Sequence, residues 1–193
     1  MKKPANWDET PPAYSGDSLS KPPIGAYIAT IVKAEEGESK NGNKMLIVSF
    51  DIAEGEYKDY FHTDYKEQLS RGWEGQWRCL LWLPTEGKGL GFLKGLVTMV
   101  EESNAGYKFA PLFDEKTLKG KKVGLVLNQC EYMSGDQVRK SYFVKRAYRV
   151  SDIRQGKHDA PVWVDVDGRE HKQNEPPTPS IELEHVDEVD IPF

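Results

Sequence analysis

The chain has 193 residues, of which 38% are hydrophobic and 30% are charged, and its formal net charge is −5. This length suits one domain of ordinary size with polar extensions. No apolar run approaches the ~20 residues of a membrane span, and the first residues contain no apolar stretch typical of a signal peptide. We therefore expect a cytoplasmic protein that does not enter a membrane.

The charge is unevenly distributed. Residues 1–150 contain 22 Lys and Arg against 20 Asp and Glu, a net +2, whereas residues 151–193 contain 4 against 11, a net −7. A mildly basic body with an acidic arm is typical of nucleic-acid-binding proteins in which the arm competes for the basic surface. The four His and two Cys residues are scattered, so we expect no metal site and no cofactor.

The chain begins with a proline-rich arm, residues 1–24, in which regular structure is disfavoured. Alternating apolar and polar residues then predict five strands, and apolar residues at helical spacing predict one helix between the third and fourth of them. The predicted strands are Gly25–Glu36, Lys44–Ala53, Trp77–Leu83, Gly120–Met133 and Val138–Val150, and the helix is Leu90–Glu102. Between the first two strands, Asn41-Gly42 indicates a hairpin turn.

Residues 54–76 are expected to form a long connection in which aromatic and basic residues are interleaved. Aromatic side chains beside cations are what a base-stacking surface requires. The alternative is that about half of these aromatics only cover the core. The last predicted strand also carries several Lys and Arg residues, and both of its faces are charged, so we expect a β-bulge that exchanges the two faces midway.

This order of elements predicts a mainly β fold, a five-stranded oligonucleotide-binding barrel with one helix between strands 3 and 4. We place the barrel in residues 25–153 and expect disordered termini. Residues 154–193 would form a flexible acidic tail with a partner-binding tip. Within this tail, Ala160–Val166 could add a short strand.

Acidic residues and a large aromatic residue meet at the C-terminal end. Asp187, Glu188 and Asp190 are followed by Ile191, Pro192 and Phe193. Such a peptide can place its Phe in a pocket while its carboxylates meet Arg or Lys on a partner. Acidic residues followed by Asp-Ile-Pro-Phe resemble the tail of bacterial single-stranded DNA-binding proteins, whose tip recruits replication and repair proteins. The alternative is a solubilising acidic tail.

The body shows a second, looser resemblance. The stretches Lys21–Tyr27 and Asp51–Tyr57 are similar to small proteins of phages and prophages that are regarded as single-stranded DNA-binding. This implies a role in phage DNA replication or recombination inside the cytoplasm of a bacterial host. The pattern of the housekeeping bacterial tetramer is missing from the body, so a tetramer is not carried over; if the chain associates with itself, a dimer is favoured.

We therefore expect a non-enzymatic protein that coats single-stranded DNA and recruits replication and recombination proteins through its tip. Aromatic residues would stack on bases, and Lys and Arg would neutralise phosphates. The expected DNA-binding residues are Tyr60, Trp73, Trp77, Lys140, Phe143, Lys145, Arg146 and Arg149.

Two other functions are compatible with the sequence. A metal-dependent nuclease or recombination enzyme would need clustered carboxylates, for which Asp51, Glu54, Glu56 and Asp59 are the best candidates. A β-barrel adaptor would use the acidic tip without binding DNA.

Overall fold

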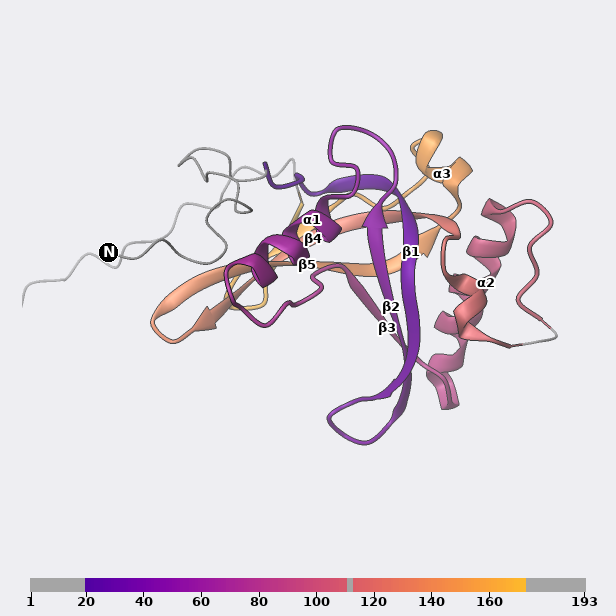
Figure 1. The fold of residues 1–193 in the computed structure, drawn as a ribbon, viewed down its shortest axis with the longest axis horizontal. Coiled ribbons are helices and arrows are strands. Elements are labelled where there is room, and N and C mark those ends of the chain that lie inside the picture. The colour runs from indigo at the N-terminus through magenta and orange to yellow at the C-terminus, as the bar shows by residue number, and fades with distance from the viewer. Residues whose placement is uncertain (1–19, 111–112, 173–193) are drawn as a thin grey trace, which may run out of the picture.

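A computed structural model describes residues 20–110 and 113–172. Its mainly β architecture is shown in Figure 1. The strands are β1 (Gly25–Glu38), β2 (Lys44–Ile52), β3 (Leu80–Pro84), β4 (Lys122–Ser134), β5 (Gln137–Tyr148), β6 (Val162–Val164) and β7 (Glu170–Lys172). The helices are α1 (Tyr60–Ser70), α2 (Leu90–Ser103) and α3 (Val150–Arg154), with short 3₁₀ turns η1 (Gly87–Gly89) and η2 (Glu115–Leu118). None of the helices in this part of the chain is long and apolar enough to cross a membrane.

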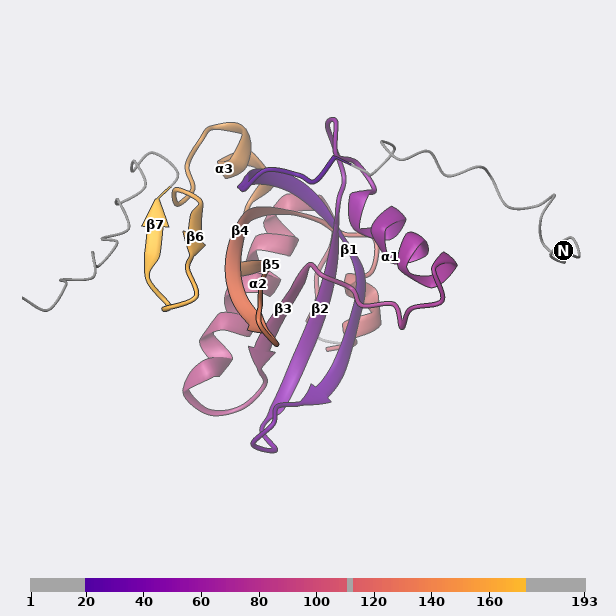
Figure 2. The same cartoon turned by 90° about the vertical axis from the view of Figure 1, so that its left-hand side faces the viewer.

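The prediction of a closed five-stranded barrel with a single helix is corrected. The strands form one seven-stranded sheet in the order β3-β2-β1-β4-β6-β7, and β5 pairs with β4. No hydrogen-bonded ladder joins β3 to β5 within residues 20–110 and 113–172, so the sheet is strongly curved but not closed (Figure 2). The sequence could not show that the barrel stays open, because the number and order of strands do not determine whether the edge strands β3 and β5 pair with each other.

The β1–β2 hairpin matches its prediction. The two strands pair antiparallel from Glu38↔Lys44 inward. Gly42 has φ of 76° and its N–H donates to the carbonyl of Ser39 at 2.9 Å. Glycine adopts this left-handed conformation without a steric cost, so the Asn41-Gly42 signal correctly located the turn.

Helix α1 lies where the sequence predicted an irregular connection, and this prediction was wrong. Asp51, near the end of β2, explains why a helix forms there. Its carboxylate accepts hydrogen bonds from the backbone N–H groups of Phe61 at 3.0 Å and His62 at 3.0 Å, in the first turn of α1, as well as from Ile52 at 2.8 Å. The first N–H groups of a helix have no partner within the helix, so a carboxylate ten residues away acts as the cap.

Asp51 is only 5% exposed, and burial raises the pKa of its carboxyl group against the opposing effect of these three hydrogen bonds. Phe61, directly beside the cap, is 1% exposed and meets the ring of Tyr142 edge-on at 5.8 Å. The cap and this aromatic contact together attach α1 to both β2 and β5.

The predicted bulge in the last strand is confirmed. The β4–β5 register passes from Leu125↔Ala147 to Leu127↔Val144, so β5 has one more residue than β4 between these pairs. Lys145 and Arg146 occupy this segment and are both exposed, whereas Val144 is buried. The extra residue explains why neither face of this strand shows a continuous apolar pattern in the sequence.

The predicted helix is confirmed as α2, and it covers one end of the curved sheet. Leu96 and Val100 of this helix enter the core at 2% and 0% exposure. The core also contains the inward-facing residues of β1 to β5, among them Ile31, Val48 and Phe50. Burial of apolar side chains of this size contributes about 1.5–3 kcal/mol each.

The sheet continues beyond the barrel boundary that was placed at residue 153. Strand β6, within the predicted extra strand, pairs parallel to β4 through Gln129↔Trp163, and β7 pairs antiparallel to β6. The Asn128 side chain accepts a hydrogen bond from the N–H of Val162 at 2.9 Å and fixes this addition. Residues up to Lys172 therefore belong to the body, and the expected tail tip, Asp187–Phe193, lies outside the described residues.

We predict that Asp51→Ala lowers the free energy of unfolding by about 3 kcal/mol, because it leaves buried N–H groups without partners. Urea unfolding followed by circular dichroism measures this value. Asp59→Asn is the matched control, since Asp59 is exposed and its side chain makes no capping hydrogen bond to α1; we expect a change within about 0.5 kcal/mol. Equal losses in both variants would contradict the capping role of Asp51.

Candidate nucleic-acid interface

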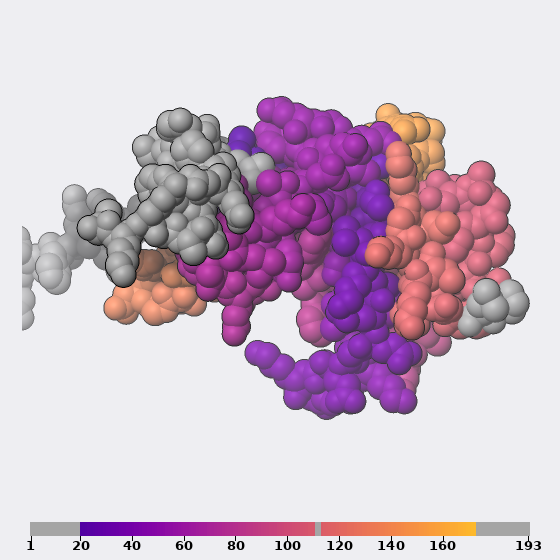
Figure 3. Space-filling model, viewed as in Figure 1, coloured from indigo at the N-terminus to yellow at the C-terminus, as the bar shows by residue number. Residues whose placement is uncertain are grey.

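A groove of about 650 Å³ lies on the face of β1, β2 and β3 that points away from the core. Its floor is formed by residues that alternate with core residues, such as Ile47 on β2 and Leu80 on β3. One wall is formed by α1 and the connection from α1 to β3. In the space-filling view the groove corresponds to the hollow between the β1–β2 hairpin and the segment around α1 (Figure 3).

Three aromatic side chains line this groove: Tyr65 from α1, Trp77 from the connection and Trp82 from β3. Trp82 is 47% exposed. Trp77 is half-buried, with its ring centroid 5.8 Å from that of Tyr65, and its indole N–H donates to the carbonyl of Phe50 at 2.9 Å. The hydrogen bond holds Trp77 in place, so this face combines one fixed indole with one exposed indole.

The connection that carries Trp77 is attached to α1 by Gln68, which is 5% exposed. The Gln68 side chain accepts from the N–H of Gln76 at 2.9 Å and donates to its carbonyl at 3.1 Å. The side-chain amide of Gln68 thus satisfies both the N–H and the carbonyl of Gln76, as the backbone of a neighbouring strand would do in a sheet. The wall of the groove is thereby positioned without belonging to the sheet.

Gly75 lets Tyr65 lie against the same connection. A Cβ atom at Gly75 would come within 2.5 Å of Cε2 of Tyr65, closer than van der Waals contact permits. Glycine is therefore required here for a close approach of ring and backbone.

The charges in the groove are few. Lys33 and Glu35 of β1 both line it and form an ion pair at 2.6 Å. Lys44, at the start of β2, is paired with Glu86 at 3.1 Å, and the Glu86 carboxylate raises its pKa. Lys44 does not line the groove, so the groove itself offers three aromatic rings and one lysine.

The structure separates the predicted aromatic residues. Trp77 lies in the groove, and Trp73, which follows the C-terminal end of α1, lies outside it and is 56% exposed. Tyr60 is 5% exposed, with its ring 5.2 Å from that of Phe61, and burial raises its pKa to about 12. Since no base can reach the face of a buried ring, Tyr60 belongs to the core. Phe143 is half-buried on β5 and does not line the groove.

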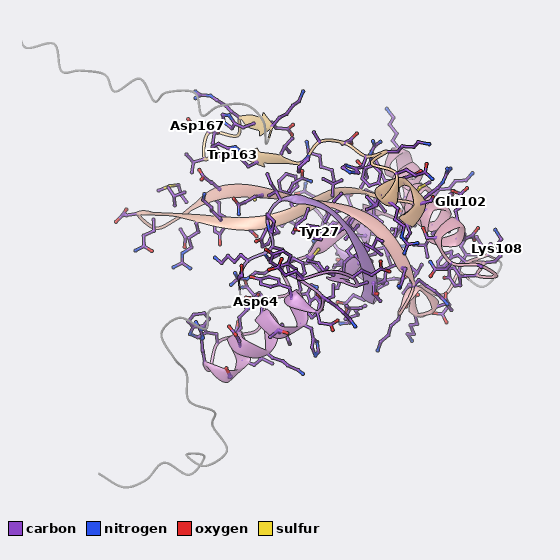
Figure 4. The ribbon with its side chains drawn as sticks, turned by 90° about the horizontal axis from the view of Figure 1, so that it is seen from above. Tyr27, Asp64, Glu102, Lys108, Trp163 and Asp167 are labelled. Carbon is purple, nitrogen blue, oxygen red and sulfur yellow. The ribbon has the colours of Figure 1, made fainter. Side chains whose placement is uncertain are left out.

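The predicted basic residues of β5, and Arg149 just after it, each meet a carboxylate. Lys140 pairs with Glu131 at 3.4 Å, Lys145 with Glu170 at 2.5 Å, Arg146 with Asp159 at 2.9 Å, and Arg149 with Glu102. None of the four lines the groove. In Figure 4, Glu102 lies at the α2 end of the molecule, far from Asp64 on α1. The described structure therefore does not bring these four cations into the groove that holds Trp77.

The acidic residues considered for a metal site are also separated by their contacts. Asp51 is occupied by three backbone N–H groups, and Glu54 pairs with Lys122 at 2.7 Å and Arg154 at 3.4 Å. In the described ranges, no group of three or more His, Cys, Asp or Glu residues is placed to hold a metal ion.

Sequence reasoning did not select Tyr65 and Trp82. Trp77 and Trp82 are five residues apart, which in a continuous strand puts them on opposite faces. Strand β3 begins only at Leu80, so the irregular backbone before it lets both indoles line one groove. The strand alternation around Leu81, Trp82 and Leu83 was the available signal for Trp82.

Comparison of the sequence with models of known protein families finds no matching family, and comparison with curated proteins finds no significant match.

We predict that Gly75→Ala lowers the free energy of unfolding by about 1–3 kcal/mol, because the new methyl group displaces Tyr65. Urea unfolding monitored by tryptophan emission reports the change. Gly95→Ala in α2 is the control, since an added Cβ meets nothing within 4 Å, and alanine in a helix is up to about 1 kcal/mol more favourable than glycine. A neutral Gly75→Ala would show that the close packing of Tyr65 is not required.

Proposed function

We propose that the protein binds single-stranded DNA, without enzymatic activity, in the groove on the outer face of β1, β2 and β3. The observation that carries this proposal is the presence of three aromatic side chains, Tyr65, Trp77 and Trp82, in one open groove. Each base offers a π face, so stacking on such a surface tolerates any sequence and contributes about 1–3 kcal/mol per base.

The connectivity supports an oligonucleotide-binding fold. Strands β1, β2 and β3 follow one another as antiparallel neighbours, α2 lies between β3 and β4, and β4 pairs antiparallel with β1 and β5. This is the order of the five-stranded oligonucleotide-binding barrel. We propose that β1–β5 are a variant of it, with an open seam between β3 and β5, an inserted α1 and an added β6–β7 hairpin.

The groove is also in the place that such barrels use. Oligonucleotide-binding folds bind over the face of strands 2 and 3, between the loops that join strands 1–2 and 4–5. Here Ile47, Leu80 and Trp82 lie on that face. The β1–β2 and β4–β5 hairpins extend from the body in different directions (Figure 1), and the second ends in the exposed Tyr132, Met133 and Val138.

The proposal has an electrostatic consequence. Because the groove contains a single lysine that is already paired, stacking would contribute more of the affinity than phosphate neutralisation. The salt dependence should therefore be shallower than that of a protein with six to ten phosphate contacts.

The acidic end completes the proposal. Residues 173–193 contain six Asp and Glu residues and no Lys or Arg, and Glu175–Ser180 contains three prolines that favour an extended spacer. We propose that Asp187–Phe193 binds replication or recombination proteins through carboxylate–Arg contacts and insertion of Phe193 into a pocket. The resemblance to phage and prophage proteins supports a role in phage DNA metabolism in a bacterial host.

We predict that Trp82→Ala weakens binding of oligo-dT by about 5- to 150-fold, the equivalent of one lost stacked base. Quenching of tryptophan emission during titration with single-stranded and duplex oligonucleotides, at two salt concentrations, measures this. Phe92→Ala is the control, because Phe92 is an aromatic residue of 66% exposure that lies on α2, outside the groove.

Two results would count against DNA binding in the groove. Equal affinity for duplex and single strands would exclude a base-stacking mode. Full affinity in Trp82→Ala would place the interface elsewhere. If no oligonucleotide binds at all, the adaptor function becomes the better explanation, and metal-dependent cleavage of the DNA would favour the nuclease.

We predict that Phe193→Ala abolishes capture of host replication proteins by the immobilised protein while oligo-dT affinity stays within about twofold. The reason is that Phe193 would fill the partner's pocket, whereas the charge of the tail is unchanged. Asp190→Asn, which removes one charge and keeps Phe193, should reduce capture only partly, since one carboxylate contact is worth less than a filled apolar pocket. Retention of every captured protein by Phe193→Ala would contradict the recruiting role.

A further inference from the structure

A second aromatic surface lies next to the groove and is not part of it. Trp73 is 56% exposed, and the guanidinium carbon of Arg71 is 5.5 Å from the centre of its ring. Trp73 and Arg71 line a hollow of about 190 Å³ together with Lys21, Arg78 and residues of α1. A large exposed indole costs free energy in water, and a cation held over it is a combination that binds bases and phosphates.

This surface is built on a well-anchored segment. The N–H of Trp73 donates to the carbonyl of Gln68 at 3.0 Å, and the N–H of Arg71 donates to the carbonyl of Glu67 at 3.1 Å. Gln68 also holds Gln76 through its side chain. One buried residue therefore fixes both the Trp73 end and the Trp77 end of the connection relative to α1.

The two aromatic surfaces are close together. Residues 73 and 77 are separated by four residue steps, so their Cα atoms are at most about 14 Å apart, even if the chain were fully extended. Tyr65 and Trp77 line the groove, whereas Asp64, Gln68 and Arg71 line the hollow on the adjacent face of α1. A single strand of DNA that leaves the groove at Trp77 would therefore meet the Trp73 surface as it passes the C-terminal end of α1.

The arginines of this surface are oriented by carboxylates. Arg71 lies 3.7 Å from Glu67, and Arg78 lies 3.4 Å from Asp64. A guanidinium has five N–H donors, so one carboxylate contact leaves donors for a phosphate. Lys21 is exposed at the rim of the same hollow.

We propose that bound single-stranded DNA continues from the groove around the C-terminal end of α1, where a further base stacks on Trp73 and Arg71 contacts a neighbouring phosphate. This inference rests on the proposed function and deepens it, since it extends the DNA path beyond the outer face of the sheet. The inserted helix α1 then has a binding role: it adds a second stacking surface to a fold that otherwise offers one.

The test compares oligo-dT of about 3 nucleotides, one for each aromatic ring of the groove, with oligo-dT of about 16 nucleotides, the upper site size for one oligonucleotide-binding fold. The short oligomer occupies the groove, and the long one also reaches Trp73. For Trp73→Ala we expect affinity for the long oligomer to fall by about 5- to 150-fold, the loss expected for one stacked base, with the short oligomer changed by less than about twofold. Trp73→Phe, which retains a ring, should restore most of the long-oligomer affinity, and Phe92→Ala should leave both affinities unchanged.

The outcomes separate this inference from the function on which it rests. If Trp82→Ala weakens both oligomers and Trp73→Ala weakens neither, the groove binds DNA and the extended path is wrong. If Trp73→Ala weakens both oligomers equally, Trp73 belongs to the primary site and the two-surface path is overturned. If the unaltered protein binds neither oligomer, the proposed function itself fails.

Discussion

The buried carboxylate of Asp51 is the interaction on which the arrangement of the candidate site depends. It lies near the end of β2 and accepts hydrogen bonds from the N–H groups of Phe61 and His62. These bonds fix the first turn of α1 next to β2, and α1 in turn carries Tyr65 and Gln68. Burial of an anionic group costs free energy, and the cost is offset because each carboxylate oxygen has a partner. Without this cap, one wall of the groove would lose its position.

Bulges shape the remainder of the sheet. The β1–β2 register shifts between Ile31 and Lys33, and the β4–β5 register shifts near Lys145 and Arg146. A bulge increases local twist and bends the strand, which allows a few long strands to wrap around one core. The first bulge presents Val32 and Lys33 at the groove. The second exposes Lys145 and Arg146 beside α2 and the β6–β7 hairpin instead.

The sequence predicted the regular elements well and the connections poorly. Apolar alternation located β1, β2 and β4, and helical spacing located α2, because each of these buries a continuous face. Strand β5 was located although its bulge interrupts the pattern. Helix α1 has no such face: its cap comes from a residue outside the helix, and its aromatic residues point to different surroundings. Similarly, β6 and β7 have three residues each, too few to show a period, and pair only because β4 has a free edge.

The candidate site was also predicted only in part, because local sequence shows which residue types are present but not which of them are buried or paired. Composition identified the connection after β2 as rich in aromatic and basic residues, and Trp77 and Trp73 do lie on accessible surfaces. The burial of Tyr60 depends on tertiary structure that the local sequence does not contain. The same holds for the pairing of the cations of β5 and of Arg149 with Glu131, Glu170, Asp159 and Glu102. Which carboxylate a basic residue meets is decided by the tertiary structure, so the sequence alone does not show how many of its donors remain for a phosphate.

The most direct test of DNA binding in the groove is to follow the indole N–H resonances of the five tryptophans during titration with oligo-dT. Trp163, stacked on His171 at 4.3 Å, serves as an internal reference, since it lies on the opposite side of the β4–β5 hairpin from Asp64 of α1 (Figure 4). If single-stranded DNA binds in the groove, the Trp77 and Trp82 signals shift while the Trp163 signal stays in place. A shift of Trp163 with no change at Trp77 and Trp82 would contradict binding in the groove.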